Sequence, residues 1–267
     1  MYTDTEGIVL RQTKTIGGRR MITLLSPKYG KIGAGTSITE KGKGKTALAL
    51  RPFTYGSYEL FKSRDSYSIN GAETKKNFYR IGEDVEKYMA AAYVLELTEK
   101  VTQENQKAQG IFNLLLDFLQ TVEKRKSNFE TLILAYQTNI LKLTGTFPAL
   151  SDCANCGKKI DDSVENILFS VKDGGIICEN CSCFENNNDN SVKDALIYRI
   201  DSSIIKVLKY FSTHSIAALE KLALDEKIEK KLSSLIREYI SYHLDVGDLK
   251  SEGFFREVKY GDYIRKD

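Results

Sequence analysis

The sequence predicts an α+β protein with a small N-terminal β-barrel, an α-helical domain and a four-cysteine segment inserted into that domain. Three observations support this fold. Short apolar runs alternate with Gly, Pro and Lys clusters in the first part of the chain, and apolar residues recur with a helical period after Gly82. Two Cys-x-x-Cys pairs then interrupt the helical pattern. The predicted domains are residues 1–82 and 83–267, with the cysteine segment at about 151–183.

The N-terminal domain reads as short strands without helical periodicity. The strands are predicted at residues 7–10, 21–25, 31–34, 47–50, 55–61 and 67–70. A region of about 75 residues with five or six such strands is too small for an immunoglobulin-type sandwich and suits a small closed barrel. The OB-fold is a barrel of this kind.

The second domain is predicted to be a bundle of helices. Apolar stripes at helical spacing predict helices over about 85–95 and 111–119. A capping box at residues 127–130 opens a third helix, which carries apolar residues from Leu132 to Leu143 and ends at Gly145. The same periodicity predicts helices over about 191–211 and 225–244. The polar tract of residues 185–190 is expected to be a surface linker.

The strongest motif is the doubled cysteine pair, formed by Cys153 and Cys156 and by Cys178 and Cys181. Two such pairs supply the four thiolates of a tetrahedral zinc site, although the 21 residues between them slightly exceed the usual spacing. Four thiolates leave no open position, so we expect structural Zn²⁺. Redox-active dithiols and cysteines without metal are the alternatives. Cys183 is expected to be a spare thiol, and its replacing Cys181 as fourth ligand is a minor alternative.

The net charge of +3 is distributed very unevenly along the chain. Residues 1–82 hold fifteen Lys and Arg against six Asp and Glu, a net charge of +9, whereas residues 83–267 hold twenty-four against thirty, a net charge of −6. A basic domain in a nearly neutral chain suggests a polyanionic partner such as DNA.

The basic residues of the barrel gather around its predicted loops. The candidate DNA-binding residues are Lys14, Arg19, Arg20, Lys31, Lys41, Lys43, Lys45 and Arg51. OB-folds bind oligonucleotides with cations along the phosphates and aromatic rings for stacking, for which Phe53, Tyr55 and Tyr58 are candidates. The alternative interpretation is that the cations are ordinary solvated residues and the aromatics belong to the barrel core.

The sequence shows no recognisable catalytic motif. Gly44-Lys45-Thr46 matches the end of a P-loop, but Thr39 stands where its first glycine is required. The two histidines, His214 and His243, have no nucleophile linked to them. No apolar run is long enough to span a bilayer, and the first residues do not resemble a secretory signal, so a cytoplasmic protein is expected. Its association with the nucleoid is expected from the DNA partner.

Several segments together resemble the bacterial RecO family of recombination mediators. They are the strand at 7–10, the loop at 41–45 followed by Leu50-Arg51-Pro52-Phe53, the passage 145–156, the second cysteine pair and the C-terminal segment 243–251. The first inter-strand loop, 16–20, departs from the family in lacking an acidic residue.

The resemblance implies an OB-fold followed by a helical domain with inserted zinc. It also implies a non-enzymatic protein that binds single- and double-stranded DNA, anneals complementary strands and helps to load RecA onto DNA covered by single-stranded DNA-binding protein (SSB). The implied partners are RecR and the acidic C-terminal tail of SSB. The alternative function is a zinc-ribbon protein that binds nucleic acid or a polymerase through the ribbon, with the barrel as an accessory.

Overall fold

The computed structural model describes residues 1–15, 19–38, 45–64, 66–160, 167–185 and 196–251. The chain divides into two units. The first contains Met1–Phe129 and the segment that begins at Asp248, and the second contains Glu130–Gly247. The first unit therefore includes two of the predicted helices as well as the barrel. The domain boundary at residue 82 stays a prediction.

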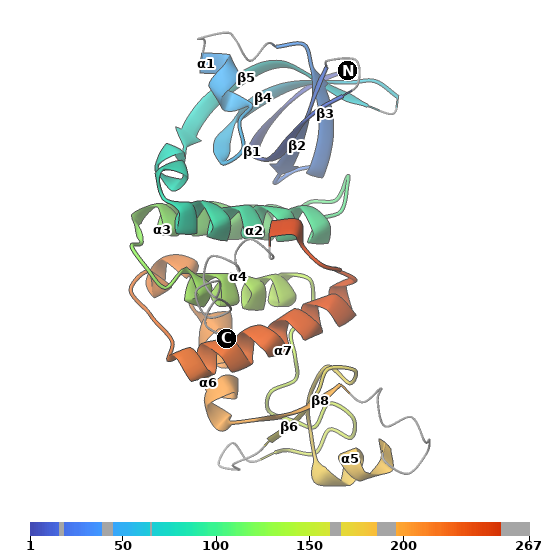
Figure 1. Cartoon of the computed structure of the whole chain (residues 1–267). Helices are drawn as coiled ribbons and strands as arrows, with labels where there is room; N and C mark the ends of the chain where they lie inside the picture. The colour runs from blue at the N-terminus through green and yellow to red at the C-terminus, as the bar shows by residue number, and fades with distance from the viewer. Residues whose placement is uncertain (16–18, 39–44, 65, 161–166, 186–195, 252–267) are drawn as a thin grey trace. The chain divides into compact units, whose positions relative to one another are not determined.

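Five strands of the first unit close into a barrel (Figure 1). They are β1 (Tyr2–Lys14), β2 (Arg20–Ser26), β3 (Gly30–Thr36), β4 (Thr54–Lys62) and β5 (Tyr67–Asn77), in the order β1-β2-β3-β5-β4. Neighbouring strands are antiparallel except for the parallel pair β3 and β5. The core consists of Val9, Ile22, Leu24, Ile32, Ala34, Leu50, Tyr58, Leu60 and Ile69. This arrangement confirms the predicted OB-like barrel.

The strand predicted at residues 47–50 is wrong, because a short helix, α1 (Lys45–Ala49), lies there. Ala and Leu are strong helix formers, and their alternation over four residues does not distinguish a strand from one helical turn. Leu50 is fully buried in the barrel core, and the Tyr58 hydroxyl donates to the Ala49 carbonyl oxygen at 2.7 Å. These two contacts fix α1 against one end of the barrel (Figure 1).

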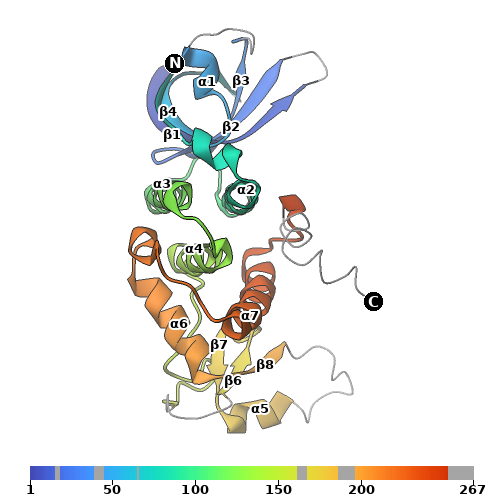
Figure 2. The same cartoon turned by 60° about the vertical axis from the view of Figure 1, so that its left-hand side comes forward.

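Two helices of the first unit lie side by side against the barrel (Figure 2). A 3₁₀ turn, η1 (Tyr79–Glu83), leads into α2 (Val85–Val101), which is followed by α3 (Gln109–Lys124). Both helices confirm the predicted apolar stripes. The loop between them is tied to the start of β3, since the N–H of Lys31 donates to the Gln103 carbonyl oxygen at 3.1 Å. Gly30, the first residue of β3, has φ +68°, and a Cβ there would lie 2.3 Å from the Gln106 carbonyl oxygen.

The second unit combines helices with a small sheet. Its helices are α4 (Phe129–Leu143), α5 (Glu179–Glu185), α6 (Ser202–Thr213), η2 (Ile216–Leu219) and α7 (Glu226–Leu244). The side-chain amide of Asn139 on α4 donates to the Phe211 carbonyl oxygen on α6 at 3.0 Å. The buried Glu229 of α7 accepts from the Thr131 hydroxyl at 3.1 Å. Apolar faces and these polar contacts together hold α4, α6 and α7.

The sheet of the second unit contains β6 (Ile167–Ser170), β7 (Gly175–Ile177) and β8 (Ile197–Ile200), in the order β7-β6-β8. Residues 197–200 were predicted as part of a helix over 191–211, and this part of the prediction is wrong. The two isoleucines three residues apart also suit a helix, but pairing with β6 places Ile200 opposite Ile167. The helix begins only at Ser202. Residues 186–195, with most of the expected linker, lie outside the described residues.

Candidate metal centre and nucleic-acid interface

The four cysteines of the two pairs come together in the second unit. The sulfur atoms of Cys153, Cys156, Cys178 and Cys181 all lie within 4.8 Å of one another, and all four thiols are free. The Sγ atoms of Cys156 and Cys178 are 3.7 Å apart, far beyond the roughly 2.05 Å of a disulfide bond. The predicted ligand set is therefore assembled as one cluster. The side chain of Cys183 lies outside the described residues.

Local backbone hydrogen bonds shape the first cysteine pair into a tight turn. The N–H of Gly157 donates to the Cys153 carbonyl oxygen at 2.8 Å, and the N–H of Cys153 donates to the Lys158 carbonyl oxygen at 2.8 Å. Gly157 has φ +73°, a conformation that glycine adopts at little cost. The turn directs both thiols of this pair toward the second pair.

The second pair follows the β6–β7 hairpin, with Cys178 after β7 and Cys181 on α5. A backbone hydrogen bond joins the two segments that carry the pairs: the N–H of Ala154 donates to the Ile176 carbonyl oxygen at 2.8 Å. Gly175 at the start of β7 has no room for a side chain: a Cβ there would lie 2.4 Å from the Ala149 carbonyl oxygen. Glycine is required at this position because the chain before the first pair runs directly against the hairpin.

The thiols of the cluster have strongly unequal proton affinities. Burial raises the pKa of Cys153, but N–H groups of Cys156, Cys178 and Asn155 outweigh burial and lower that pKa to about 6. Hydrogen bonding to the Cys178 thiol raises the pKa of Cys181 to about 12. Four adjacent thiolates repel one another, so full deprotonation of the set requires a cation.

The geometry fits a tetrahedral metal ion. Metal–sulfur bonds of about 2.3 Å, as in zinc sites, place the sulfurs of a regular tetrahedron about 3.8 Å apart. The Cys156–Cys178 separation already has this value, and the 4.8 Å limit on the others leaves a contraction of at most about 1 Å. The four sulfur atoms are therefore close enough together to hold one metal ion.

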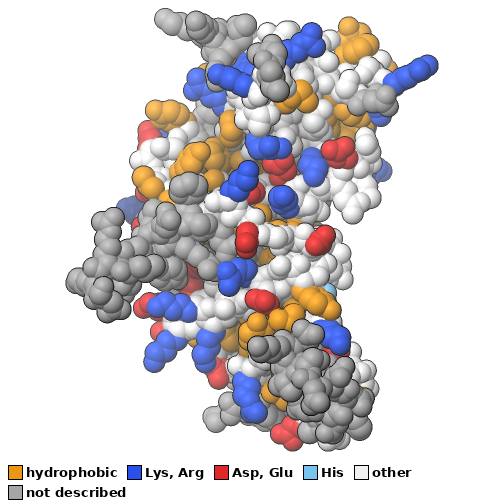
Figure 3. Space-filling model, turned by 45° about the vertical axis from the view of Figure 1, so that its right-hand side comes forward, with side chains coloured by type: hydrophobic (Ala, Val, Ile, Leu, Met, Phe, Trp, Pro, Cys, Tyr) orange, Lys and Arg blue, Asp and Glu red, His pale blue; other side chains and the backbone are white. Residues whose placement is uncertain are grey.

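The candidate DNA-binding residues lie in different environments. Lys14 and Arg19 are exposed on either side of the β1–β2 connection, and Arg51 is exposed just after α1. Lys41 and Lys43 lie outside the described residues, as does the side chain of Lys45 at the start of α1. Figure 3 shows Lys and Arg side chains over the barrel, at the top of the view, with hydrophobic side chains between them.

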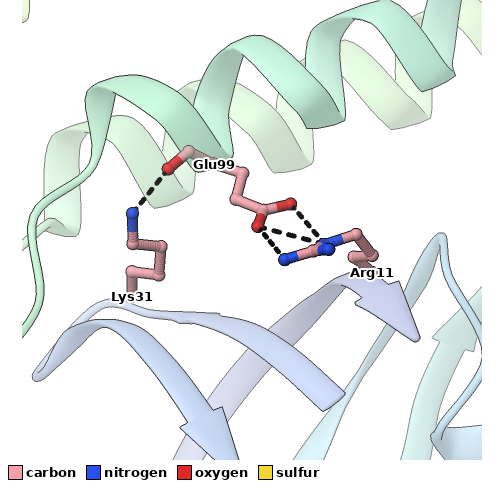
Figure 4. Close-up of polar contacts among 3 residues, drawn as sticks. All are labelled: Arg11, Lys31 and Glu99. Atoms are coloured by element: carbon pink, nitrogen blue, oxygen red, sulfur yellow. Dashed lines mark hydrogen bonds and ion pairs between the residues drawn. The ribbon is translucent and has the colours of Figure 1, made fainter. Parts of the chain in front are cut away.

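Two of the predicted cations are engaged within the protein. Arg20 is only 5% exposed, and its guanidinium donates to the Ile38 carbonyl oxygen. The Lys31 ammonium donates to the backbone carbonyl oxygen of Glu99 on α2 at 2.9 Å (Figure 4). Both contacts hold parts of the first unit together, which limits what these two side chains can offer to a phosphate.

Sequence reasoning missed the residues that join the barrel to α2. Arg11 of β1 forms a two-pronged ion pair with the Glu99 carboxylate, with its Nη2 2.7 Å from Oε1 and its Nε 3.1 Å from Oε2 (Figure 4). The partners are 88 residues apart in sequence. No local pattern links them, so only the fold could reveal the pair.

The aromatic candidates also separate by environment. Tyr58 is 1% exposed in the barrel core, where burial raises its pKa, so its prediction as a base-stacking residue is wrong. Tyr55 is half-buried and contacts Phe112 of α3 edge to face, with ring centroids 5.9 Å apart. Phe53 is half-buried and lines a cleft on the barrel.

Among the described residues, no helix combines the length and apolar character that a membrane crossing requires.

Comparisons with known proteins cover nearly the whole chain. The family model for the N-terminal part of recombination protein O matches residues 1–78, and the model for its C-terminal part matches residues 82–253. The chain is 32% identical to the DNA repair protein RecO of Alkaliphilus metalliredigens over 245 residues, which cover 92% of this chain and 95% of that protein. It is 29% identical to the protein of the same name from Caldanaerobacter subterraneus (95% and 97% covered) and 26% identical to that from Listeria welshimeri (98% and 97%).

Proposed function

The chain belongs to the RecO family of DNA repair and recombination proteins, and from this membership we propose that it acts as a non-enzymatic recombination mediator. In this role it binds single- and double-stranded DNA, anneals complementary strands and assists RecA loading on SSB-coated DNA. Family membership carries the mediator role, and the observation that supports DNA binding by this chain is the net charge of +9 on residues 1–82, most of which form the barrel.

Annealing needs no chemical step from the protein. Two phosphate backbones repel each other, and a basic surface that contacts both strands lowers this repulsion while it releases condensed counterions. The exposed cations proposed to contact phosphates are Lys14, Arg19 and Arg51. Lys41, Lys43 and Lys45 belong to the same proposal on the basis of sequence alone. Arg20 and Lys31 are proposed to support this surface through the contacts described above.

We propose that Cys153, Cys156, Cys178 and Cys181 hold a structural Zn²⁺. Zinc would supply the charge that allows the four thiols to ionise together, and it would fix the β6–β7 hairpin to the turn at residues 153–157. The full set of sulfur ligands leaves no coordination position for a substrate. RecR and the acidic C-terminal tail of SSB are proposed as partners from the family resemblance.

The test compares two triple variants of the full chain. K41A/K43A/K45A removes three barrel lysines, whereas K227A/K230A/K231A removes three exposed lysines of α7 and serves as the charge-matched control. Binding to single strands and annealing of complementary oligonucleotides without ATP, with and without SSB, are measured. The first variant should bind about tenfold more weakly, with a salt slope shallower by about 2, at about 0.7 per lost phosphate contact.

Unchanged affinity and slope in the first variant would remove these lysines from the interface. If K158A/K159A, next to the cysteine cluster, abolished binding while the barrel variant did not, DNA binding would belong to the cysteine segment and the zinc-ribbon alternative would be favoured.

A further inference from the structure

A cleft of about 620 Å³ lies on the first unit. It is bounded by α1, by the segment 51–54, by η1 and by the first turns of α2. Its apolar lining includes Leu48, Phe53, Tyr79 and Tyr88, and the side chains of Arg51 and Asn77 also reach it. All of these residues lie within the same unit as the barrel.

Three large side chains at the cleft are substantially exposed to solvent. Tyr79 is 72% exposed, Tyr88 is 50% exposed and Leu48 is 40% exposed. Large apolar side chains that gather around a hollow on the surface commonly mark a binding site. Phe53 packs edge to face against Tyr88, with ring centroids 5.5 Å apart and an interplanar angle of 71°. This contact fixes the Tyr88 ring at the wall of the cleft.

The backbone of Phe53 is held in an unfavourable conformation. Its φ is +65°, a value that bulky residues rarely adopt. The conformation is maintained from both sides, since the N–H of Phe53 donates to the Val9 carbonyl oxygen at 3.2 Å and its own carbonyl oxygen accepts from the N–H of Phe78 at 3.3 Å. Strain of this kind persists where the surrounding structure imposes it, and it is concentrated at functional sites.

The polar groups at the cleft suit a nucleotide. Arg51 is exposed at the cleft, and in the part of the chain that the structure describes no carboxylate forms an ion pair with it. A guanidinium of this kind can contact a phosphate, while aromatic faces stack with any base. The amide of Asn77 adds a donor and an acceptor for a base edge.

We propose that this cleft receives an unstacked base of single-stranded DNA, with the base against the rings of Tyr79 and Tyr88 and a neighbouring phosphate against Arg51. The inference rests on the proposed DNA-binding function and extends it to a site selective for single strands. Bases in a duplex are paired and stacked, so the two tyrosines contribute to the affinity for single strands and not to that for duplex DNA. The net charge of the barrel domain favours a polyanion over a neutral or basic surface, and among polyanions the exposed rings favour DNA because its bases can stack on them.

The experiment uses the full chain with the double variant Y79A/Y88A, the conservative variant Y79F/Y88F and the control Y2A. Tyr2 is 71% exposed on the same barrel, which matches Tyr79, but it lies outside the cleft and contacts Phe61. Affinities for a single-stranded oligonucleotide and for the matching duplex are measured over a range of salt concentrations. A single strand that contains 2-aminopurine reports stacking directly, and its emission can be excited separately because the chain contains no Trp.

The double alanine variant should bind single strands about tenfold more weakly and lose the quenching of 2-aminopurine, while its duplex affinity and salt slope stay unchanged. Y79F/Y88F and Y2A should behave like the unmodified chain. Equal losses on both DNA forms, or no loss on single strands, would overturn the cleft assignment while the DNA-binding function stands. If the unmodified chain binds neither DNA form, the proposed function fails and the inference fails with it. The single variant Y79A, at the most exposed ring, repeats the test if the double variant does not fold.

Discussion

Arg19 and Arg20 are adjacent in the sequence but lie in different environments. Arg19 is exposed, whereas Arg20 is 5% exposed and its guanidinium donates to the Ile38 carbonyl oxygen. Arg20 is the first residue of β2 and lies two residues before the buried Ile22, on the inward side of the strand, whereas Arg19 precedes the strand. The charge of the pair is evident from the sequence, but where β2 begins and which of its side chains point inward are set by the barrel.

This difference predicts opposite effects of two alanine substitutions. Arg20→Ala removes a charged hydrogen bond to a backbone carbonyl and should lower the free energy of unfolding by about 1–3 kcal/mol. Arg19→Ala should leave that free energy within about 0.5 kcal/mol and instead weaken DNA binding. Urea denaturation and oligonucleotide binding of both variants provide the measurements. Equal destabilisation by the two substitutions would contradict the assigned environments.

The contacts of Glu99 could not be predicted from the sequence either. The sequence shows a carboxylate on a helix and two cations on strands. It does not show that Arg11 pairs with the Glu99 carboxylate, or that the Lys31 ammonium reaches the backbone carbonyl oxygen of the same residue. Likewise, the aromatic residues of β4 could be recognised as candidates for stacking, but only the barrel shows that Tyr58 is buried.

At the scale of elements, most helices and strands could be predicted from local sequence patterns. The five barrel strands and the helices α2, α3, α4 and α7 follow from period and turn residues, and the cysteine cluster follows from spacing. The two errors, α1 and β8, concern segments of four or five residues whose patterns suit both helix and strand. Their structure is decided by distant partners, the barrel core for Leu50 and β6 for Ile200.

The cysteine segment should depend on metal as one cooperative element. Cys156→Ser, or treatment with a strong chelator, should remove about one metal ion per chain and accelerate amide hydrogen exchange in residues 149–183. The barrel should be unaffected, because among the residues that the structure describes its strand pairing and its core involve none of this segment. Mass spectrometry of exchanged peptides, together with a metal assay, measures both effects.

A second variant should replace Cys153, which is more buried than Cys156. Cys153 is only 2% exposed, and its Sγ accepts from the N–H of Cys178 at 3.4 Å. Cys153→Ser should have an equal or larger effect than Cys156→Ser. A chain that is purified without metal and exchanges slowly in this region would contradict the metal assignment.

At the scale of the whole molecule, the first unit is built from two separate parts of the sequence. The chain leaves this unit after Phe129 and returns to it at Asp248. The return is anchored at Glu96 of α2, whose carboxylate accepts from the N–H of Lys250 at 3.1 Å and from the N–H and hydroxyl of Ser251 at 2.9 and 2.6 Å. Burial raises the pKa of Glu96, but the hydrogen bonds from Ser251 and Lys250 outweigh burial and hold that pKa below its usual value.

The lowered pKa of Glu96 predicts a pH-dependent contribution to stability. Because the folded-state pKa lies below the unfolded value of about 4.3, the carboxylate stabilises the fold fully above that value and loses its contribution as pH falls through the folded-state pKa. Glu96→Gln should lower the free energy of unfolding by about 1 kcal/mol at neutral pH. Denaturation curves of both proteins should converge as the solution is acidified, and a difference that grows on acidification would contradict this assignment.

The anchor of residues 250 and 251 on α2 has a consequence for the order of assembly. A ribosome releases the barrel and α2 first, and the residues that bind Glu96 only after the entire second unit has been synthesised. The N-terminal unit of a nascent chain therefore lacks one of its own contacts until the second unit is complete. Removal of Lys250 and Ser251, although they are remote in sequence from the barrel, would leave the Glu96 carboxylate of α2 without these hydrogen bonds.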